Sequence, residues 1–288
     1  MPAEADKTAL LLRIAEALER LAPSPSPSAS LEAADGFVWR GAEDRLAPVP
    51  AISRIELDLL KGIERQKGLL RDNTLSFAQG RPANNALLWG ARGAGKSSLV
   101  KAVHATVAAE VPAARLALVE LHREDLPLLP KLLEQLRASE RRFLLFCDDL
   151  SFDAGEAAYK ALKVVLEGGL EGRPENVLFY ATSNRRHLIS RDMIENERST
   201  AINPGEAVEE KVSLSDRFGL WIGFAPQDQV QYLEIVAAYA DAFDLPWDRE
   251  KIRAAALRWA VQRGARSGRV AWQFIEHLRG SEGAALEE

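Results

Sequence analysis

The stretch that most constrains the fold of this chain is residues 90–97, Gly-Ala-Arg-Gly-Ala-Gly-Lys-Ser, which fits the spacing G-x-x-x-x-G-K-S of a phosphate-binding loop. An apolar run precedes it at 86–89, and a helix-like segment follows at 98–103. Between a buried strand and a helix, such glycines let successive backbone N–H groups surround a phosphate, where the helix start adds the positive end of its dipole. The sequence therefore predicts that the chain binds a nucleoside triphosphate.

Within this loop, Lys96 is expected to reach the β- and γ-phosphates, and Ser97 is expected to hold Mg²⁺. The residues expected to bind the nucleotide here are Gly90, Ala91, Arg92, Gly93, Ala94, Gly95, Lys96, Ser97 and Ser98. The competing interpretation is a glycine-rich turn that matches by chance, and the strand and helix on either side disfavour it.

Composition limits the class of protein and its partners. With 288 residues, 47% of them hydrophobic, the chain can bury a large core. Its net charge of −5 gives no global basic field, which leaves nucleic-acid or membrane binding to a local patch. The single Cys147 excludes an intrachain disulfide and fits a reducing compartment. The N-terminal residues show no signal-peptide pattern and no apolar stretch is long enough to span a bilayer, so we expect a cytoplasmic protein.

The first 35 residues are predicted to be an appendage. Leu11, Ile14, Leu18 and Leu21 form one apolar stripe on a short helix over 6–22, and a Pro/Ser linker follows at 23–28. This helix either docks on its own domain or mediates association with a partner or a second copy.

Residues 36–225 are predicted to be an α/β domain with a five-stranded parallel sheet and flanking helices. Helices are expected over 97–109 and 157–166. Five short apolar runs are the predicted strands: 86–90, 116–121, 143–148, 177–182 and 220–224. Residues 226–288 show only helical patterns, at 228–242, 248–263 and 269–278, and are predicted to be a small all-helical domain.

Polar residues at two strand ends supply candidate catalytic groups. Asp148 and Asp149 end the third apolar run, where carboxylates at the edge of a parallel sheet face Mg²⁺ and the γ-phosphate. We expect Asp148 to hold the ion, and Asp149 to orient or deprotonate the attacking water. Asn184 follows the fourth run and could hydrogen-bond the γ-phosphate or that water. The alternatives are solvated surface acids and a turn-forming Asn.

Together these motifs resemble the AAA+ ATPases from about residue 60 to 278. Residues 90–97 match the Walker A motif, 144–149 the Walker B motif, and Asn184 the polar residue termed sensor 1. The resemblance implies that Ile63, within 62–66, lies beside the adenine, and that the helical end is a lid. It also implies that Arg217, within 215–219, is an arginine finger that enters the site of a neighbouring subunit, so that ATP and ADP are bound by a homo-oligomer, with a hexamer as the family pattern.

More narrowly, residues 147–152, 167–170 and 214–221 look like a bacterial family of small stand-alone AAA+ ATP-binding proteins of unassigned function. The chain departs from the wider family in two places. Asp149 stands where Glu is usual, so we expect either slow hydrolysis or the use of another acid, such as Asp153 or Glu156. The sensor 2 arginine is matched loosely by Arg269, with Arg266 as an alternative.

Two further segments allow more than one interpretation. Residues 251–275 contain six cations and no Asp or Glu, and Trp259 and Trp272 are interleaved with them. The cations are Lys251, Arg253, Arg258, Arg263, Arg266 and Arg269. A nucleic-acid surface is the less favoured interpretation, because no base-reading motif accompanies them, and packing of both Trp side chains in the lid is favoured. The polar loop 189–211 could face a neighbour or a substrate, or be a plain surface excursion.

The leading function is a Mg²⁺-dependent ATPase that couples hydrolysis to lid motion and remodelling of a partner. The alternative is a nucleotide-dependent binding module that hydrolyses ATP slowly or not at all. A small-molecule phosphotransferase is the third and weakest, because no acceptor pocket is apparent.

Overall fold

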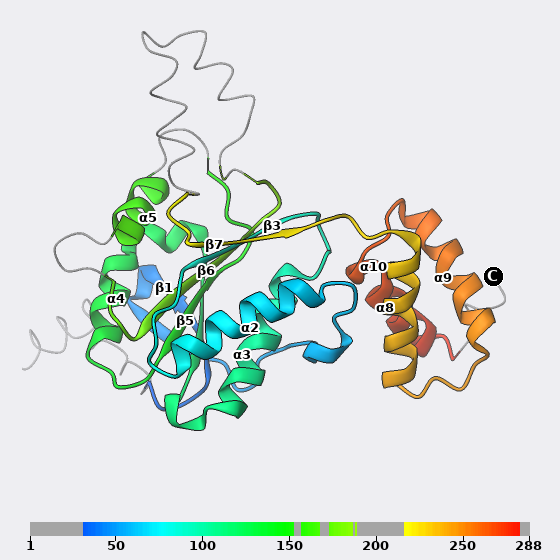
Figure 1. The fold of residues 1–288 in the computed structure, drawn as a ribbon, viewed down its shortest axis with the longest axis horizontal. Coiled ribbons are helices and arrows are strands. Elements are labelled where there is room, and N and C mark those ends of the chain that lie inside the picture. Colours follow the sequence, from blue (N-terminus) through cyan, green and yellow to red (C-terminus); the bar gives the residue numbers. More distant parts are fainter. Residues whose placement is uncertain (1–30, 153–156, 168–172, 187, 189–215, 283–288) are drawn as a thin grey trace, which may run out of the picture.

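The computed structural model describes residues 31–152, 157–167, 173–186, 188 and 216–282 (Figure 1). The predicted helix at 6–22, the linker at 23–28, the alternative acids Asp153 and Glu156 and the loop 189–211 lie outside the described residues.

The centre of the protein is a mixed seven-stranded sheet of order β2-β1-β4-β5-β6-β3-β7. All neighbours are parallel except the β1–β2 pair. The strands are β1 Gly36–Arg40, β2 Arg45–Pro48, β3 Ala86–Gly90, β4 Ala117–Leu121, β5 Phe143–Cys147, β6 Val177–Ser183 and β7 Leu220–Phe224. The five predicted strands correspond to β3 through β7.

The prediction of a five-stranded sheet was wrong by two strands. β1 has only three apolar residues in a row between Gly36 and Arg40, and β2 has two before Pro48. Runs this short cannot be told from loop by periodicity. β2 lies at the edge of the sheet, where a strand tolerates Pro because one side needs no ladder partner.

Helices cover both faces of the sheet (Figure 1). On one face lie α2 Glu64–Ala78 and α3 Lys96–Glu110, and on the other lie α4 Leu129–Arg137 and α5 Ala157–Glu167. Successive β3 residues alternate between the layers: Leu87 packs in the α4/α5 core, whereas Ala86 and Leu88 pack in the α2/α3 core. Burial on both faces explains why these strands are continuously apolar.

After β7 the chain enters three helices, which we call the lid: α8 Gln229–Ala242, α9 Arg249–Arg263 and α10 Gly268–Gly280 (Figure 1). The lid has an apolar core of its own, with Tyr232 and Phe274 among its buried residues. Each lid helix begins at a polar cap, Asp228, Asp248 or Ser267. These caps explain why the three helices could be placed from the sequence.

The segment that includes the 3₁₀ helix η2 Leu57–Leu59 joins the lid to the sheet domain. Ile55 packs against the α2/α3 core and against the lid core, and Leu59 packs against the lid core. Movement of the lid therefore has to rearrange contacts of Ile55 and Leu59.

A buried histidine lies inside α3. His104 is 2% exposed, its Nε2 lies 3.1 Å from the carbonyl oxygen of Leu116, and its Nδ1 has no hydrogen-bond partner among the described residues. Burial lowers the pKa of His104 to about 4 from an ordinary 6.5. The fold therefore holds this ring neutral.

This pKa predicts a pH dependence of stability. Between about pH 6.5 and 4 the unfolded chain binds a proton at His104 that the folded chain does not, so the free energy of unfolding falls as pH falls, by about 3 kcal/mol over this window. His104→Leu should remove this contribution. Urea unfolding of both proteins between pH 4 and 7 would show a shallower slope for the variant, and parallel curves would contradict the prediction.

Candidate nucleotide-binding site

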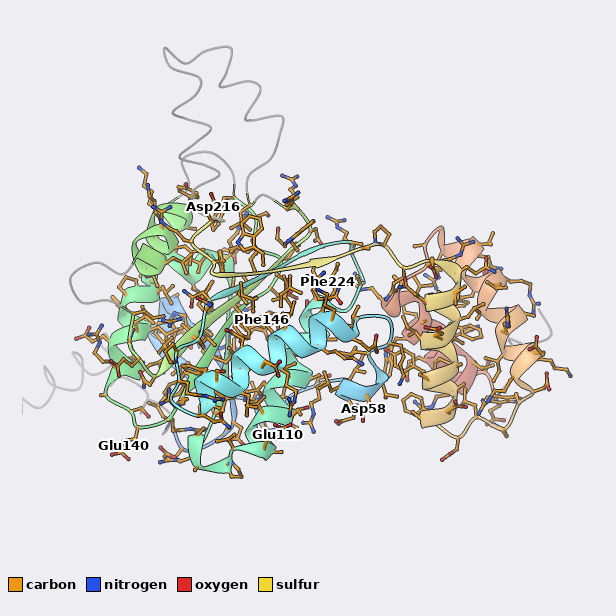
Figure 2. The ribbon with its side chains drawn as sticks, viewed as in Figure 1. Asp58, Glu110, Glu140, Phe146, Asp216 and Phe224 are labelled. Carbon is orange, nitrogen blue, oxygen red and sulfur yellow. The ribbon has the colours of Figure 1, made fainter. Side chains whose placement is uncertain are left out.

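A cleft of about 600 Å³ lies at the carboxyl ends of β3, β5 and β6, between the sheet and the lid. Figure 2 shows the lid beyond Phe224, the last residue of β7. In the sheet β3 lies between β6 and β7. The chain leaves β3 through α3 on one face of the sheet, whereas it leaves β4 and β5 through α4 and α5 on the other face. The face on which the chain leaves the strands therefore reverses beside β3. Ligands of open α/β sheets bind at such a reversal.

The cleft has an apolar end and a charged end. The side chains of Ile55, Leu60 and Ile63 line the apolar end, together with Tyr239 and Trp272 of the lid. Arg92, Lys96, Arg269, Asp148 and Asp149 line the charged end, and Lys61 is a fourth cation that lines the cleft. Although the chain has a net charge of −5, the charges that line this cleft favour an anion that also carries an apolar group.

The phosphate-binding loop has a conformation that its glycines permit. Gly90 has φ 127°, and a Cβ there would lie 2.1 Å from the carbonyl oxygen of Phe224. That same oxygen accepts a hydrogen bond from the Ala91 N–H at 3.0 Å. Gly90 and Ala91 thus anchor the loop to β7, and neither lines the cleft.

The start of α3 faces the cleft. Gly95 is its N-cap, no side chain among the described residues caps it, and residues 93–98 all line the cleft. The first N–H groups of a helix have no partner within the helix and carry the positive end of its dipole. A phosphate would satisfy these donors, so the loop fits the predicted ligand.

Lys96 lies at the centre of the charged end. Its side chain is 6% exposed, and Nζ donates to the carbonyl oxygens of Gly90 at 2.9 Å and Ala91 at 2.8 Å and to Asn184 Oδ1 at 3.1 Å. Burial lowers the pKa of Lys96, whereas the nearby Asp148 raises it. A phosphate oxygen would add a charged partner to an amine that is held here by neutral oxygens.

Asp148 and Ser97 form the part of the site that fits Mg²⁺. Ser97 Oγ donates to Asp148 Oδ1 at 2.6 Å, and the hydroxyl of Thr182 donates to the same oxygen. A hydroxyl and a carboxylate are the oxygen ligands that Mg²⁺ takes, with the remaining positions left to phosphates and water. The described residues contain no group of three His, Cys, Asp or Glu side chains that could hold a metal by themselves.

Asp149 and Asn184 are hydrogen-bonded to each other. Asn184 Nδ2 donates to Asp149 Oδ1 at 2.6 Å, while the Oδ1 of the same amide accepts from Lys96. The predicted base is thus linked through Asn184 to Lys96, the lysine predicted to bind phosphate. Asp149 has φ 51°, in the left-handed region, which aims it away from the line of β5.

The lid arginines take different positions. Arg269, in the first turn of α10, lines the cleft. Arg266 lines a separate hollow of about 480 Å³, together with Ala91 and Gln227. Between the two alternatives, Arg269 is therefore the one that faces the cleft.

Arg217 does not lie at the cleft of its own chain. It lies three positions before Leu220, the first residue of β7, and β7 is parallel to β3. Arg217 therefore lies at the amino edge of the strands while the loop lies at the carboxyl edge. Figure 2 labels Asp216, which comes before β7, and Phe224, the last residue of β7, and Phe224 is the one nearer the lid. The whole length of the strand separates Arg217 from the loop.

Trp259 and Trp272 pack within the lid. The ring of Trp259 stacks on His277 with centroids 4.9 Å apart, and the guanidinium of Arg263 lies 4.6 Å from the Trp259 centroid. Trp272 meets Tyr239 edge-on at 5.3 Å. This is the arrangement that the favoured sequence interpretation predicted.

Sequence reasoning missed Thr182 and most of the apolar end of the cleft. Thr182 lies two residues before Asn184, so strand alternation could have placed both on one side of β6. The contributions of Ile55, Tyr239 and Trp272 come from segments far apart in the sequence and follow no local pattern.

The chain belongs to the family described as "Protein of unknown function (DUF815)", whose model matches residues 32–282. No curated protein matches it in sequence. Among solved structures, the ORC1 protein of Aeropyrum pernix in complex with DNA is similar at 15% identity and TM-score 0.53, over 75% of this chain and 61% of that chain.

Two other structures are similar at lower scores. The RuvB Holliday junction branch migration motor of Thermotoga maritima has 16% identity and TM-score 0.46, over 77% of this chain and 72% of that one. The FIGL-1 AAA domain in complex with ADP has 14% identity and TM-score 0.46, over 78% and 85%. The fold of the chain is that of an AAA+ P-loop NTPase, which confirms the predicted fold class; the ORC1 similarity supports the fold alone.

The loop geometry predicts the effect of Gly93→Ala. Gly93 has φ 72°, and an added Cβ would lie 2.8 Å from Ser267 Oγ and 3.0 Å from Ser267 Cβ, so the loop or the start of α10 would have to move. We expect ATP affinity to fall by about tenfold or more. Gly68→Ala is the matched control, because a Cβ at that exposed position of α2 meets nothing within 4 Å. Calorimetric titration with ATP should separate the two variants, and equal affinities would contradict the prediction.

Proposed function

We propose that this chain is a Mg²⁺-dependent ATPase that couples its nucleotide cycle to lid movement and to remodelling of a partner. One observation carries the proposal: three chemically distinct groups meet in a single cleft between the sheet and the lid. They are the lysine and serine of the phosphate loop, the two carboxylates after β5 and the amide after β6.

In this proposal the triphosphate lies on residues 92–98, with Lys96 and Arg269 on its oxygens. The adenine occupies the apolar end beside Ile63. Adenine is favoured over guanine by the AAA+ resemblance. Closure of the lid would bring Arg269 and Trp272 toward the nucleotide, because both belong to α10.

Ser97 and Asp148 would hold Mg²⁺, which supplies positive charge against the phosphate oxygens as the terminal phosphate is cleaved. Asp149 is proposed to orient the attacking water and accept its proton. For that role its carboxylate has to exchange the bond with Asn184 for one with water, and Asn184 becomes free to contact the γ-phosphate. ATP would therefore rearrange the hydrogen bonds that join Lys96, Asn184 and Asp149.

Arg217 is proposed to act in trans. The cleft and Arg217 lie at opposite edges of the strands, so one chain can offer its arginine to the cleft of the next while its own cleft receives another. Such a head-to-tail contact closes into a ring when the rotation permits. The proposed assembly is a homo-oligomer, for which the AAA+ resemblance implies a hexamer.

A second candidate is a nucleotide-dependent binding module with little or no hydrolysis. The observation that favours it is the short Asp149 side chain, which is hydrogen-bonded to Asn184. If that bond persists with ATP bound, the acid cannot activate water.

As to membranes, none of the helices in the described ranges combines the length and the apolarity needed to cross a bilayer.

Two variants test whether the cleft of one chain and Arg217 of a neighbouring chain form one active site. Arg217→Ala and Asp149→Asn should each abolish phosphate release while ATP binding persists, because each keeps the loop and Lys96. Mixed in equal amounts they should regain activity, since about a quarter of head-to-tail contacts then pair an intact acid with an intact arginine. Arg253→Ala, an exposed lid arginine away from the cleft, is the control and should behave like the native chain.

The outcomes separate the two candidates. Restored phosphate release in the mixture supports an oligomeric ATPase with a finger in trans. A mixture as inactive as its components contradicts the finger, and a native chain that binds ATP but releases no phosphate above background favours the binding module.

A further inference from the structure

Thr182 joins β6 to the acidic turn that follows β5. The paired residues of these strands end at Cys147↔Ala181, so Thr182 lies one step beyond the ladder, beside the first residue of the turn. It is 1% exposed. Its carbonyl oxygen accepts a hydrogen bond from the Leu150 N–H at 2.7 Å. The backbone contact between the strands thus resumes after the turn has passed.

The hydroxyl of Thr182 fills the gap in that ladder. Thr182 Oγ1 accepts a hydrogen bond from the Asp149 N–H at 2.9 Å and donates its own to Asp148 Oδ1. A hydroxyl has a single proton, and the amide of Asp149 can only donate, so the proton of Thr182 must point at Asp148. One buried side chain thereby contacts both carboxylate residues.

These bonds fix two features that the proposed reaction needs. Asp148 Oδ1 receives the hydroxyls of Ser97 and Thr182, which restricts rotation of its carboxylate toward the magnesium position. Asp149 is held at φ 51°, a conformation that residues other than glycine rarely adopt, by the bond from its N–H to Thr182.

We propose that Thr182 is a positioning residue that sets the orientation of Asp148 toward the metal and of Asp149 toward the attacking water. Thr182 lines the cleft but is almost wholly buried, and in this proposal it acts through the two carboxylate residues to which its hydroxyl is bonded. The inference rests on the proposed function, because it assigns Asp148 and Asp149 the roles given above.

Thr182→Val tests the role of the hydroxyl, because valine keeps the branched shape and loses the hydrogen bonds. Two measurements that need no hydrolysis apply. We expect the half-saturating Mn²⁺ concentration of the ADP-bound protein, followed by electron paramagnetic resonance, to rise about 10- to 100-fold. We also expect hydrogen exchange of the Asp149 amide, followed by nuclear magnetic resonance in the nucleotide-free protein, to accelerate.

Two further variants complete the design. Thr182→Ser keeps the hydroxyl and should restore native values in both measurements. Thr74→Val removes another buried hydroxyl, which donates to the carbonyl oxygen of Leu70 in α2 and is also hydrogen-bonded to the hydroxyl of Tyr180 in β6. Because it contacts neither carboxylate residue, it should leave both values unchanged. Native values in Thr182→Val would overturn the proposal. A Thr182→Ser variant as impaired as the valine variant would overturn it as well. If the valine variant does not fold, the serine variant decides the matter, because values that depart from native would then overturn the proposal.

These results are separable from the proposed function. If the native chain releases no phosphate but Thr182→Val still shifts Mn²⁺ affinity and amide exchange, the ATPase proposal fails while Thr182 keeps its positioning role. If the native chain hydrolyses ATP and the valine variant matches it in both measurements, the inference about Thr182 is the one that fails.

Discussion

The pairing of β3 with a parallel neighbour on each side is the constraint on which the candidate site depends. Its register sets Leu88 opposite Thr182 and Gly90 opposite Phe224, so the phosphate loop starts level with the ends of β6 and β7. The next ladder brings the end of β5 to the same edge. A shift of one residue in either ladder would turn the side chains to the other face and separate the lysine from the carboxylates.

Burial and hydrogen bonds together hold the charged side chains of the cleft in place. Lys96 is kept away from water, near two carboxylates, and is hydrogen-bonded to two loop carbonyls and to Asn184. The carboxylates in turn are hydrogen-bonded to side chains of β6 and of the residue that follows it. Because one amide and one hydroxyl link all of these groups, a ligand that binds Lys96 also changes the surroundings of Asp149. This linkage offers a physical route from ligand binding at Lys96 to Asp149, the residue proposed as the base.

The sequence predicted those features of the fold and the site that depend on a few neighbouring residues, and it missed those that depend on contacts between distant segments. The loop, the strand-end acids and Asn184 were predictable because each combines a short apolar run with a polar residue at its end, and β1 and β2 were missed because Phe37–Trp39 and Leu46–Ala47 are too short to show a period. The choice between Arg266 and Arg269 depended on how α10 meets the loop, and the role of Thr182 on the register of two strands. Neither is encoded in a local pattern. The site roles themselves stay predictions.

The most direct test of the central claim is calorimetric titration of the full chain and of Lys96→Ala with ATP in the presence of Mg²⁺. The account predicts one ATP bound per native chain and a loss of affinity of about 100-fold or more in the variant, because the variant loses the buried amine that is proposed to bind the β- and γ-phosphates. Thermal unfolding of both proteins would verify that the variant is folded. A native chain that does not bind ATP, or a folded variant that binds it as tightly as the native chain, would contradict the account.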